Sequence, residues 1–213
     1  MKVLPVTTVL GRPRRCDCGW LAIQCHDLAL IAEHEKNANL MIYACLEARN
    51  AIEQLWFEIY ILLKGGSMAK DEFEQLQKRK DGWAAAIKEL EPQYRKMTQF
   101  AAIIMKLDRR APCGIVVWDF KKLRNIWHRL SSYCHAQGHL QPTMGNQDWV
   151  ANGLALVHDV FDYFSTQLHG ATNGLIRPEN MTPNARMVWN DFVSDMIDEE
   201  QVEIRLRLVA PLN

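Results

Sequence analysis

The chain has 213 residues, of which 48% are hydrophobic and 23% are charged, an ordinary composition for a globular protein. Lys plus Arg and Asp plus Glu each number 25, so the formal net charge is zero. This balance excludes a protein that coats nucleic acid through a global positive field, and any nucleic-acid site must be a local basic patch. The length suits a single domain, residues 1–213, which needs neither disulfides nor a metal to fold.

No stretch of the sequence is long and apolar enough to cross a membrane. The most apolar run, residues 51–63, is interrupted by Glu53 and Glu58. The first residues lack the apolar core of a signal peptide, because Pro5 breaks their short apolar segment. We therefore expect a cytoplasmic protein without a membrane partner, whose six cysteines are reduced thiols.

The N-terminal segment combines a strand pattern with a small group of metal-ligating residue types. Residues 2–10 are rich in Val, Thr and Leu and predict a short strand at the edge of a sheet. Cys16, Cys18, Cys25 and His26 follow. Structural zinc sites usually separate paired cysteines by about two to four residues and need a second pair elsewhere, which this chain lacks. We favour buried thiols at the start of a helix and keep these four residues as weak metal candidates.

Two helices are predicted next, at residues 20–34 and 40–64. The longer one is apolar over most of its circumference, so we expect a central helix with more than one packed face. Arg49 and Glu53 form an i,i+4 pair on it. Its other polar residues share one stripe: Glu47, Asn50, Gln54 and Glu58. The stripe is interpreted as the solvated side; the alternative is that Glu47 and Asn50 orient arginines of a later helix.

Further helices are predicted at about residues 67–91, 93–110, 147–170 and 184–200. Pro92 kinks the chain or restarts the helix between the first two of these. Residues 201–211 alternate between apolar and polar positions, which predicts a half-buried strand. Because an isolated strand leaves its backbone unpaired, we expect it to pair with the N-terminal strand. The predicted fold is all-α, with a small two-stranded β feature that pairs the termini.

Residues 119–138 carry the densest set of groups suited to chemistry. On a straight helix with about 100° per residue, five of them form a core face: Phe120, Leu123, Trp127, Leu130 and Cys134. Four others fall within about 60° of one another on the adjacent face: Arg124, His128, Ser131 and His135. Three more lie further round toward solvent: Asn125, Arg129 and Ser132.

A row of Arg, His and Ser beside a core face is typical of a cleft lining. Histidine exchanges protons near neutral pH, and arginine stabilises a phosphate that gains charge. Together they suit metal-free phosphodiester cleavage, in which one group takes the 2′-OH proton and a cation holds the phosphorane. They do not suit a zinc site, because adjacent arginines repel a dication. The competing interpretation is a solvated basic helix face with two incidental histidines.

The same stretch resembles the HEPN superfamily. Arg129 and His135 are separated by five residues, and their context HRLSSYCHA is similar to the R-x-L-S-x-Y-x-H form of several HEPN-like bacterial proteins. The segment RNIWH, Arg124 to His128, resembles the common Arg-Asn-x-x-x-His form but is one residue shorter. The segment ACLEARNAIEQLWFE is similar to the first long helix of such proteins. The resemblance covers about residues 37–170 and leaves extensions at 1–36 and 171–213.

This resemblance implies an antiparallel four-helix-bundle core that dimerises so that two motifs meet in one cleft. It implies a metal-independent endoribonuclease without a cofactor, acting on RNA, as in toxin–antitoxin or antiphage defence systems. Arg129 would hold the scissile phosphate, His135 would serve as acid and base, and Arg124 and His128 would assist. Five residues would support them: Asn125, Ser132, Tyr133, Glu47 and Asn50.

Helix geometry leaves two candidate sets open. On an unbroken helix Arg129 and His135 point about 120° apart. They converge only if the helix ends or bends near residues 131–132, or if a partner subunit supplies the complement; otherwise Arg124, His128 and His135 form the better set. The alternative function is a non-catalytic all-α interaction or nucleotide-binding module of a multi-protein bacterial system, with a protein partner.

Overall fold

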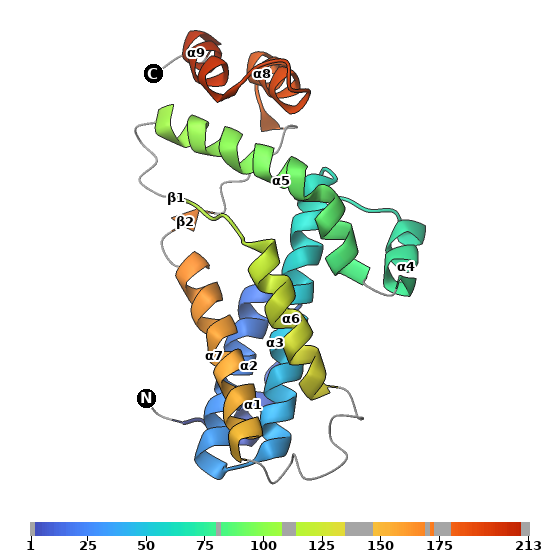
Figure 1. Ribbon diagram of the computed structural model, residues 1–213, viewed down its shortest axis with the longest axis vertical. Helices are drawn as coiled ribbons and strands as arrows, with labels where there is room; N and C mark the ends of the chain where they lie inside the picture. Colours follow the sequence, from blue (N-terminus) through green and yellow to red (C-terminus); the bar gives the residue numbers. More distant parts are fainter. Residues whose placement is uncertain are drawn as a thin grey trace. The chain divides into compact units, whose positions relative to one another are not determined.

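The computed structural model describes residues 3–79, 82–107, 114–134, 147–168, 171–172 and 180–209. Over these residues the protein is all-α, as the sequence predicts, with nine helices and two strands of two residues each (Figure 1). The chain divides into two compact units. Unit 1 combines Met1–Phe57 with Asp119–Thr166, and unit 2 combines Glu58–Trp118 with Gln167–Asn213.

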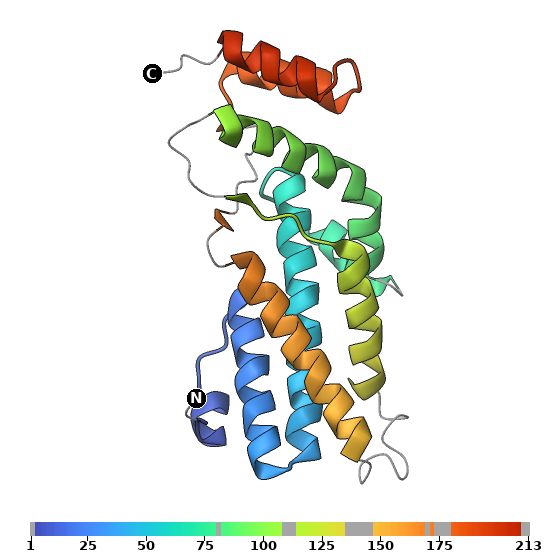
Figure 2. The same cartoon turned by 60° about the vertical axis from the view of Figure 1, so that its left-hand side comes forward.

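Unit 1 contains a four-helix bundle. Its elements are α1 (Val6–Leu10), α2 (Cys18–Glu35), the larger part of α3 (Ala38–Leu63), α6 (Phe120–Cys134) and α7 (Gln147–Leu168). Helices α2, α3, α6 and α7 lie side by side and alternate in direction along the chain (Figures 1 and 2). The predicted antiparallel four-helix-bundle core is therefore confirmed.

Local signals in the sequence set the turn between the first two bundle helices. Helix α2 begins where Asp17 accepts a hydrogen bond from the Trp20 backbone N–H at 2.7 Å and ends at Lys36, whose φ of 52° is left-handed. Asn37 then caps α3, because its side-chain oxygen accepts from the backbone N–H groups of Asn39 and Leu40. This tight turn forces α2 and α3 into antiparallel contact.

Close packing at one glycine fixes the approach of α7 to α3 and α6. A Cβ atom at Gly153 would lie 2.5 Å from Met41 Sδ and 3.1 Å from Tyr133 Cε1. The Gly153 carbonyl also accepts a hydrogen bond from the buried Cys45 thiol at 3.7 Å. The absence of a side chain at Gly153 is therefore what lets these three helices pack together.

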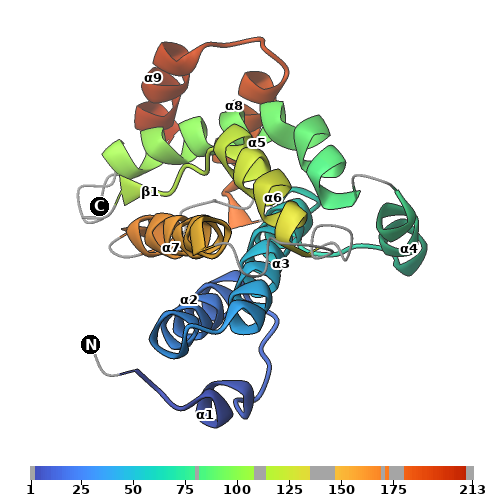
Figure 3. The same ribbon diagram turned by 60° about the horizontal axis from the view of Figure 1, so that its bottom comes forward.

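Unit 2 is built on one long helix. Its elements are the end of α3, α4 (Lys70–Lys78), α5 (Gly82–Leu107), β1 (Gly114–Ile115), β2 (Ala171–Thr172), α8 (Pro183–Val193) and α9 (Glu199–Val209). Helices α8 and α9 are neighbours and both pack on α5 (Figure 3). Phe100 of α5 meets Trp189 and Phe192 of α8, with ring centroids 5.2 and 6.2 Å apart. These three buried rings pack α8 against α5.

Helix α5 continues through Pro92, so the predicted helices 67–91 and 93–110 do not meet at this residue. The predicted helix 67–91 instead divides earlier, into α4 and the first part of α5. Proline removes one backbone hydrogen bond from a helix interior. The apolar face nevertheless continues across it, from Ile87 to Tyr94 and Met97, all of which are buried. Burial along this face outweighs the lost bond.

The two strands predicted at the termini are helices in the structure, so the predicted β feature is wrong. Residues 6–10 form α1 and residues 199–209 form α9. The described strand pair lies elsewhere: Gly114 pairs in parallel with Ala171, and Ile115 with Thr172. At the C-terminal end a helix is favoured over the predicted strand, because Val202 and Leu206, four residues apart, are both buried on the same face of α9.

Candidate functional site

Helix α6 carries the predicted site, and its start is well defined. Asp119 caps the helix by accepting from the Lys122 backbone N–H at 2.9 Å, and its own N–H donates to the Tyr163 hydroxyl at 2.9 Å. The buried side chains are Phe120, Leu123, Ile126, Leu130 and Tyr133. Trp127 and Cys134, which the helical phase assigns to the core face, are only half-buried.

The outer face of α6 is basic. Its exposed side chains are Lys121, Lys122, Asn125, His128, Arg129 and Ser132. Lys122 Nζ lies 4.2 Å over the ring of Tyr163. Within the described ranges no carboxylate forms an ion pair with Lys121 or Arg129. This face is therefore a local patch of positive charge of the kind that a polyanion can neutralise.

The structure describes three of the four predicted catalytic residues. His128 and Arg129 are exposed and Arg124 is half-buried, all on α6. His135 lies outside the described residues, so neither the Arg129–His135 pair nor the set of Arg124, His128 and His135 is tested as a whole.

The predicted supporting residues of α6 mainly serve the helix itself. The Ser132 hydroxyl donates to the Arg129 carbonyl at 2.7 Å, and Asn125 is exposed. Tyr133 is buried with its ring 5.0 Å from that of Trp149. The pKa of Tyr133 is raised, because the effect of burial exceeds the opposing effect of the nearby Arg129 guanidinium. A neutral phenol is thus favoured, which makes Tyr133 a packing residue in this arrangement.

Sequence reasoning missed a polar cluster at the contact of α3 and α6, which we call the Trp127 cluster: Arg49, Glu53, Trp127 and His128. Trp127 Nε1 donates to Glu53 Oε1 at 2.8 Å, and Arg49 pairs with the same carboxylate at 3.0 Å. The Arg49 guanidinium also lies 4.8 Å over the Trp127 ring, and the His128 ring meets that ring edge-on at 4.9 Å. The cluster fixes the indole beside the basic face.

The polar stripe of α3 binds the N-terminal segment. Arg14 reaches both oxygens of Glu47, at 2.7 and 3.1 Å, and Gln54 Nε2 donates to the Cys16 carbonyl at 3.0 Å. Asn50 is half-buried on the same helix. The Glu47 carboxylate therefore binds Arg14 of the N-terminal segment, and not an arginine of α6 as in the alternative interpretation of the stripe.

The weak zinc candidates do not form a metal site. Cys16 is exposed, whereas Cys18 and Cys25 are buried. The Cys25 thiol donates to the Ala22 carbonyl at 3.1 Å, and burial raises its pKa, which disfavours the thiolate that zinc needs. Within the described ranges, no three His, Cys, Asp or Glu residues gather in a way that could hold a metal ion.

A second group of titratable residues joins α2 to α7. The His26 ring stacks on Phe161 with centroids 3.8 Å apart and meets the ring of His158 at 5.3 Å. His158 Nε2 lies 2.8 Å from a Glu33 carboxylate oxygen. Burial lowers the pKa of His26, and the neighbouring His158 lowers it further. Each histidine looks isolated in the sequence, because helical spacing does not show which helices become neighbours.

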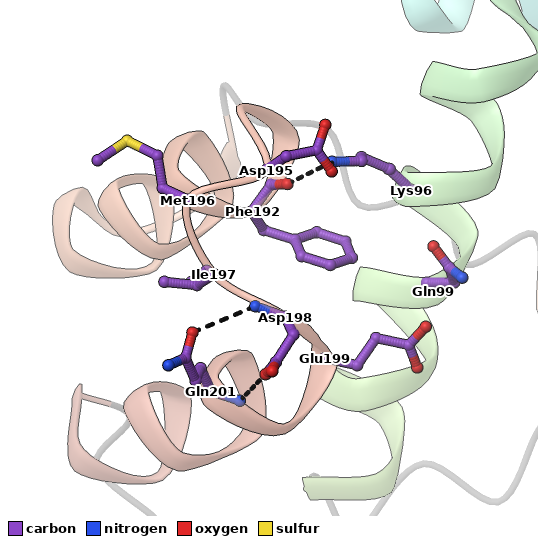
Figure 4. A pocket seen from close by; sticks show the side chains of 9 residues that line it. All are labelled: Lys96, Gln99, Phe192, Asp195, Met196, Ile197, Asp198, Glu199 and Gln201. Atoms are coloured by element: carbon purple, nitrogen blue, oxygen red, sulfur yellow. Dashed lines mark hydrogen bonds and ion pairs between the residues drawn. The ribbon is translucent and has the colours of Figure 1, made fainter.

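Unit 2 contains an open hollow of about 500 Å³ between α5 and the α8–α9 turn (Figure 4). Phe192 points into it, and Lys96 and Asp195 lie at its edge. Lys96 Nζ donates to the Phe192 carbonyl at 2.6 Å and to an Asp195 carboxylate oxygen at 2.5 Å. The lysine therefore caps the C-terminus of α8, and its charge is neutralised within the fold.

None of the described helices has the length and apolar character that spanning a lipid bilayer requires. Comparison of the chain with protein-family models, with curated proteins and with solved structures gives no match.

Proposed function

We propose that the protein is a HEPN-like, metal-independent endoribonuclease that cleaves single-stranded RNA as a dimer in the bacterial cytoplasm, as part of a toxin–antitoxin or antiphage defence system. The observation that carries this proposal is the exposed basic face of α6 on an antiparallel four-helix bundle, to which the consecutive residues His128 and Arg129 both belong. The resemblance of the Arg129–His135 segment to HEPN motifs adds the expected reaction.

Charge favours RNA over an uncharged ligand. The net charge of the whole chain is zero, yet Lys121 and Arg129 find no carboxylate partner in the described part of the chain. Binding a phosphate backbone here would release counterions and offset the repulsion between these cations. The half-buried Trp127 indole beside them adds an aromatic edge, a group on which unpaired bases can pack.

The proposed reaction needs a base, a cation and no metal. A neutral imidazole, from His135 or His128, takes the proton of the ribose 2′-OH, and the 2′-oxygen attacks the adjacent phosphorus. Arg129 stabilises the extra negative charge of the phosphorane. The 5′-oxygen then leaves and takes a proton from an imidazolium. The products are a 2′,3′-cyclic phosphate and a free 5′-hydroxyl.

The first test is cleavage of a labelled single-stranded RNA by the purified protein in EDTA. We expect cleavage that leaves a 2′,3′-cyclic phosphate, and none of the same strand with 2′-deoxyriboses. His135→Ala and Arg129→Ala should each lower the rate by about a hundredfold or more, as loss of an acid/base or charge-stabilising group does. His34→Ala and Arg95→Ala, which change exposed residues of other helices, are the matched controls.

The outcome of this cleavage assay decides between the proposed nuclease and the alternative, a module that binds RNA without cleaving it. Undiminished cleavage by both His135→Ala and Arg129→Ala would remove the catalytic assignment. If the wild-type protein leaves RNA intact, the catalytic proposal fails, and the salt dependence of RNA binding then tests the alternative, a non-catalytic module. Lys121→Ala and Arg129→Ala should each reduce the slope of log affinity against log salt by about 0.7 if α6 contacts the phosphates.

A further inference from the structure

Several large apolar side chains of α8, α9 and the turn between them remain exposed although both helices pack on α5. Of the large apolar side chains described by the structure, the three with the greatest exposed fractions all lie here: Leu208 at 81%, Met196 at 71% and Met187 at 66%. Ile204 is 52% exposed. On α9, Ile204 and Leu208 share one face, about 160° from the buried Val202 and Leu206. Helix α9 therefore has two apolar faces, of which one is covered.

The charges on α9 are ordered along the helix. Its first half carries Glu199, Glu200 and Glu203, and its second half carries Arg205 and Arg207. When such a helix meets an identical helix in antiparallel orientation, the acidic half of each lies against the basic half of the other. A parallel arrangement would oppose like charges. The pattern is therefore complementary to itself about a two-fold axis.

From these two features we infer that the open face of α9 binds the same face of α9 in a second copy of the chain, antiparallel, with Ile204 at the two-fold axis. Leu208 then covers the neighbouring turn of the other copy. With this register Arg207 of one copy lies beside Glu200 of the other, because both are displaced from Ile204 by about one turn in opposite directions.

The arginines are already held at the edges of this face. Arg205 pairs with Asp191 of α8 at 2.6 Å, and Arg207 pairs with Glu203 one turn earlier. A guanidinium has five N–H donors, so each can keep its internal partner and still bind a carboxylate of a second copy. Glu200 is exposed and has no partner in the described part of the chain, which leaves it available for that contact.

The size of the face predicts a dimer of moderate affinity. A helix of eleven residues is about 16 Å long. Two such helices bury less than the roughly 800 Å² per partner of a standard interface. We therefore expect dissociation in the micromolar range. This inference does not rest on the proposed nuclease activity. Ile204→Glu and Leu208→Glu distinguish the α9 interface from a dimer that forms through α6.

The first experiment is sedimentation velocity of the full chain at concentrations from about 1 to 100 µM, which bracket the expected micromolar dissociation constant. The wild type should pass from monomer to dimer. Ile204→Glu and Leu208→Glu should each raise the dissociation constant about tenfold or more. Leu10→Glu, at another exposed apolar residue, should leave it unchanged. Circular dichroism confirms that each variant is folded.

The second experiment tests the orientation with single charge reversals. Glu200→Arg alone and Arg207→Glu alone should each weaken self-association, because each homodimer then opposes like charges. Mixing the two variants should restore a heterodimer, in which both charge pairs attract. A monomeric wild type at 100 µM, or a mixture that associates no better than its components, would overturn the inference. A dimer unaffected by Ile204→Glu would place the interface elsewhere and overturn it as well.

Discussion

Gly153 sets how closely the bundle can pack. In an exposed helix, Gly→Ala stabilises by about 1 kcal/mol because alanine favours the helix. At Gly153 the new methyl group would overlap Met41 Sδ at 2.5 Å, so we expect Gly153→Ala to lower the free energy of unfolding by about 1–3 kcal/mol, the usual cost of overpacking. Urea denaturation followed by circular dichroism measures it.

A double-mutant cycle identifies the cause of that loss. Met41→Ala removes the overlapping thioether, so Gly153→Ala should cost less in the Met41→Ala background than in the wild type. Asn152→Ala, at the exposed neighbouring position, should change the stability little. Equal costs in both backgrounds would mean that the backbone of α7, and not the contact with Met41, requires glycine.

His26 makes the stability depend on pH in a defined direction. Its pKa is lowered in the folded state, mainly by burial and then by His158, from an unfolded value of about 6.5. The unfolded chain therefore binds the proton more readily. The stabilisation is complete above that value and is lost as the pH falls from about 6.5 toward the folded pKa. We expect the unfolding midpoint to decrease over this window.

The comparison of variants assigns that dependence to one ring. His26→Phe keeps an aromatic ring against Phe161 but cannot be protonated, so it should flatten the pH dependence below 6.5. His34→Ala, at an exposed histidine of the same helix, should leave the dependence as in the wild type. A slope unchanged by His26→Phe would locate the titrating group elsewhere.

At this scale the sequence predicts side chains that share a helix and misses those that meet across helices. The Arg49–Glu53 pair follows from i,i+4 spacing, and the structure confirms it at 3.0 Å. The bond from Trp127 to Glu53 does not follow from spacing, because a helical phase gives the face of a residue and not its neighbour. The same limit hid the contact of His26 with His158.

Among the elements, α9 shows why an alternating pattern misleads. Val202, Ile204, Leu206 and Leu208 alternate as in a strand, yet the same residues contain i,i+4 pairs. The decisive signal is a capping box just before them. Asp198 accepts from the Gln201 backbone N–H at 2.8 Å, and Gln201 Oε1 accepts from the Asp198 N–H at 3.3 Å. This local motif could have identified the helix from the sequence.

Removing that cap should loosen α9. Asp198→Ala deletes the acceptor for a helix N-terminal N–H group, which costs about 1 kcal/mol. Hydrogen exchange at the first turn of α9 should accelerate accordingly. Asp198→Ser retains an acceptor at the same position and should restore most of the protection. Unchanged exchange in Asp198→Ala would show that packing of Val202 and Leu206 alone holds this helix end.

The whole chain passes between its two units three times, after Phe57, Trp118 and Thr166. Neither unit is a continuous segment, and α3 runs from one into the other. The sequence does not reveal this division, because apolar periodicity continues along α3 without a linker. The four bundle helices and their order along the chain are readable from periodicity, whereas the assignment of segments to units depends on contacts distant in sequence.

This connectivity predicts that the two units unfold together. Unfolding unit 1 would free both ends of the unit 2 segment 58–118, which contains α5, and one end of the segment 167–213. Gly153→Ala in unit 1 should therefore also lower the protection of slowly exchanging amides in α5. Hydrogen exchange read by mass spectrometry across a urea series measures both units at once. Destabilisation confined to unit 1 peptides would show two independently folding units instead of the single domain that the sequence predicts.

The cysteines differ in burial, so the order in which their thiols react reports the order in which the helices open. Cys16 is exposed, Cys134 is half-buried, and Cys25 and Cys45 are buried with raised pKa values. An alkylating reagent therefore meets these thiols in sequence: the first at once, the second as the end of α6 opens, and the last two only when α2 and α3 separate from the bundle. Peptide mapping of the alkylated cysteines over time then gives the order in which these helices open, without any substitution.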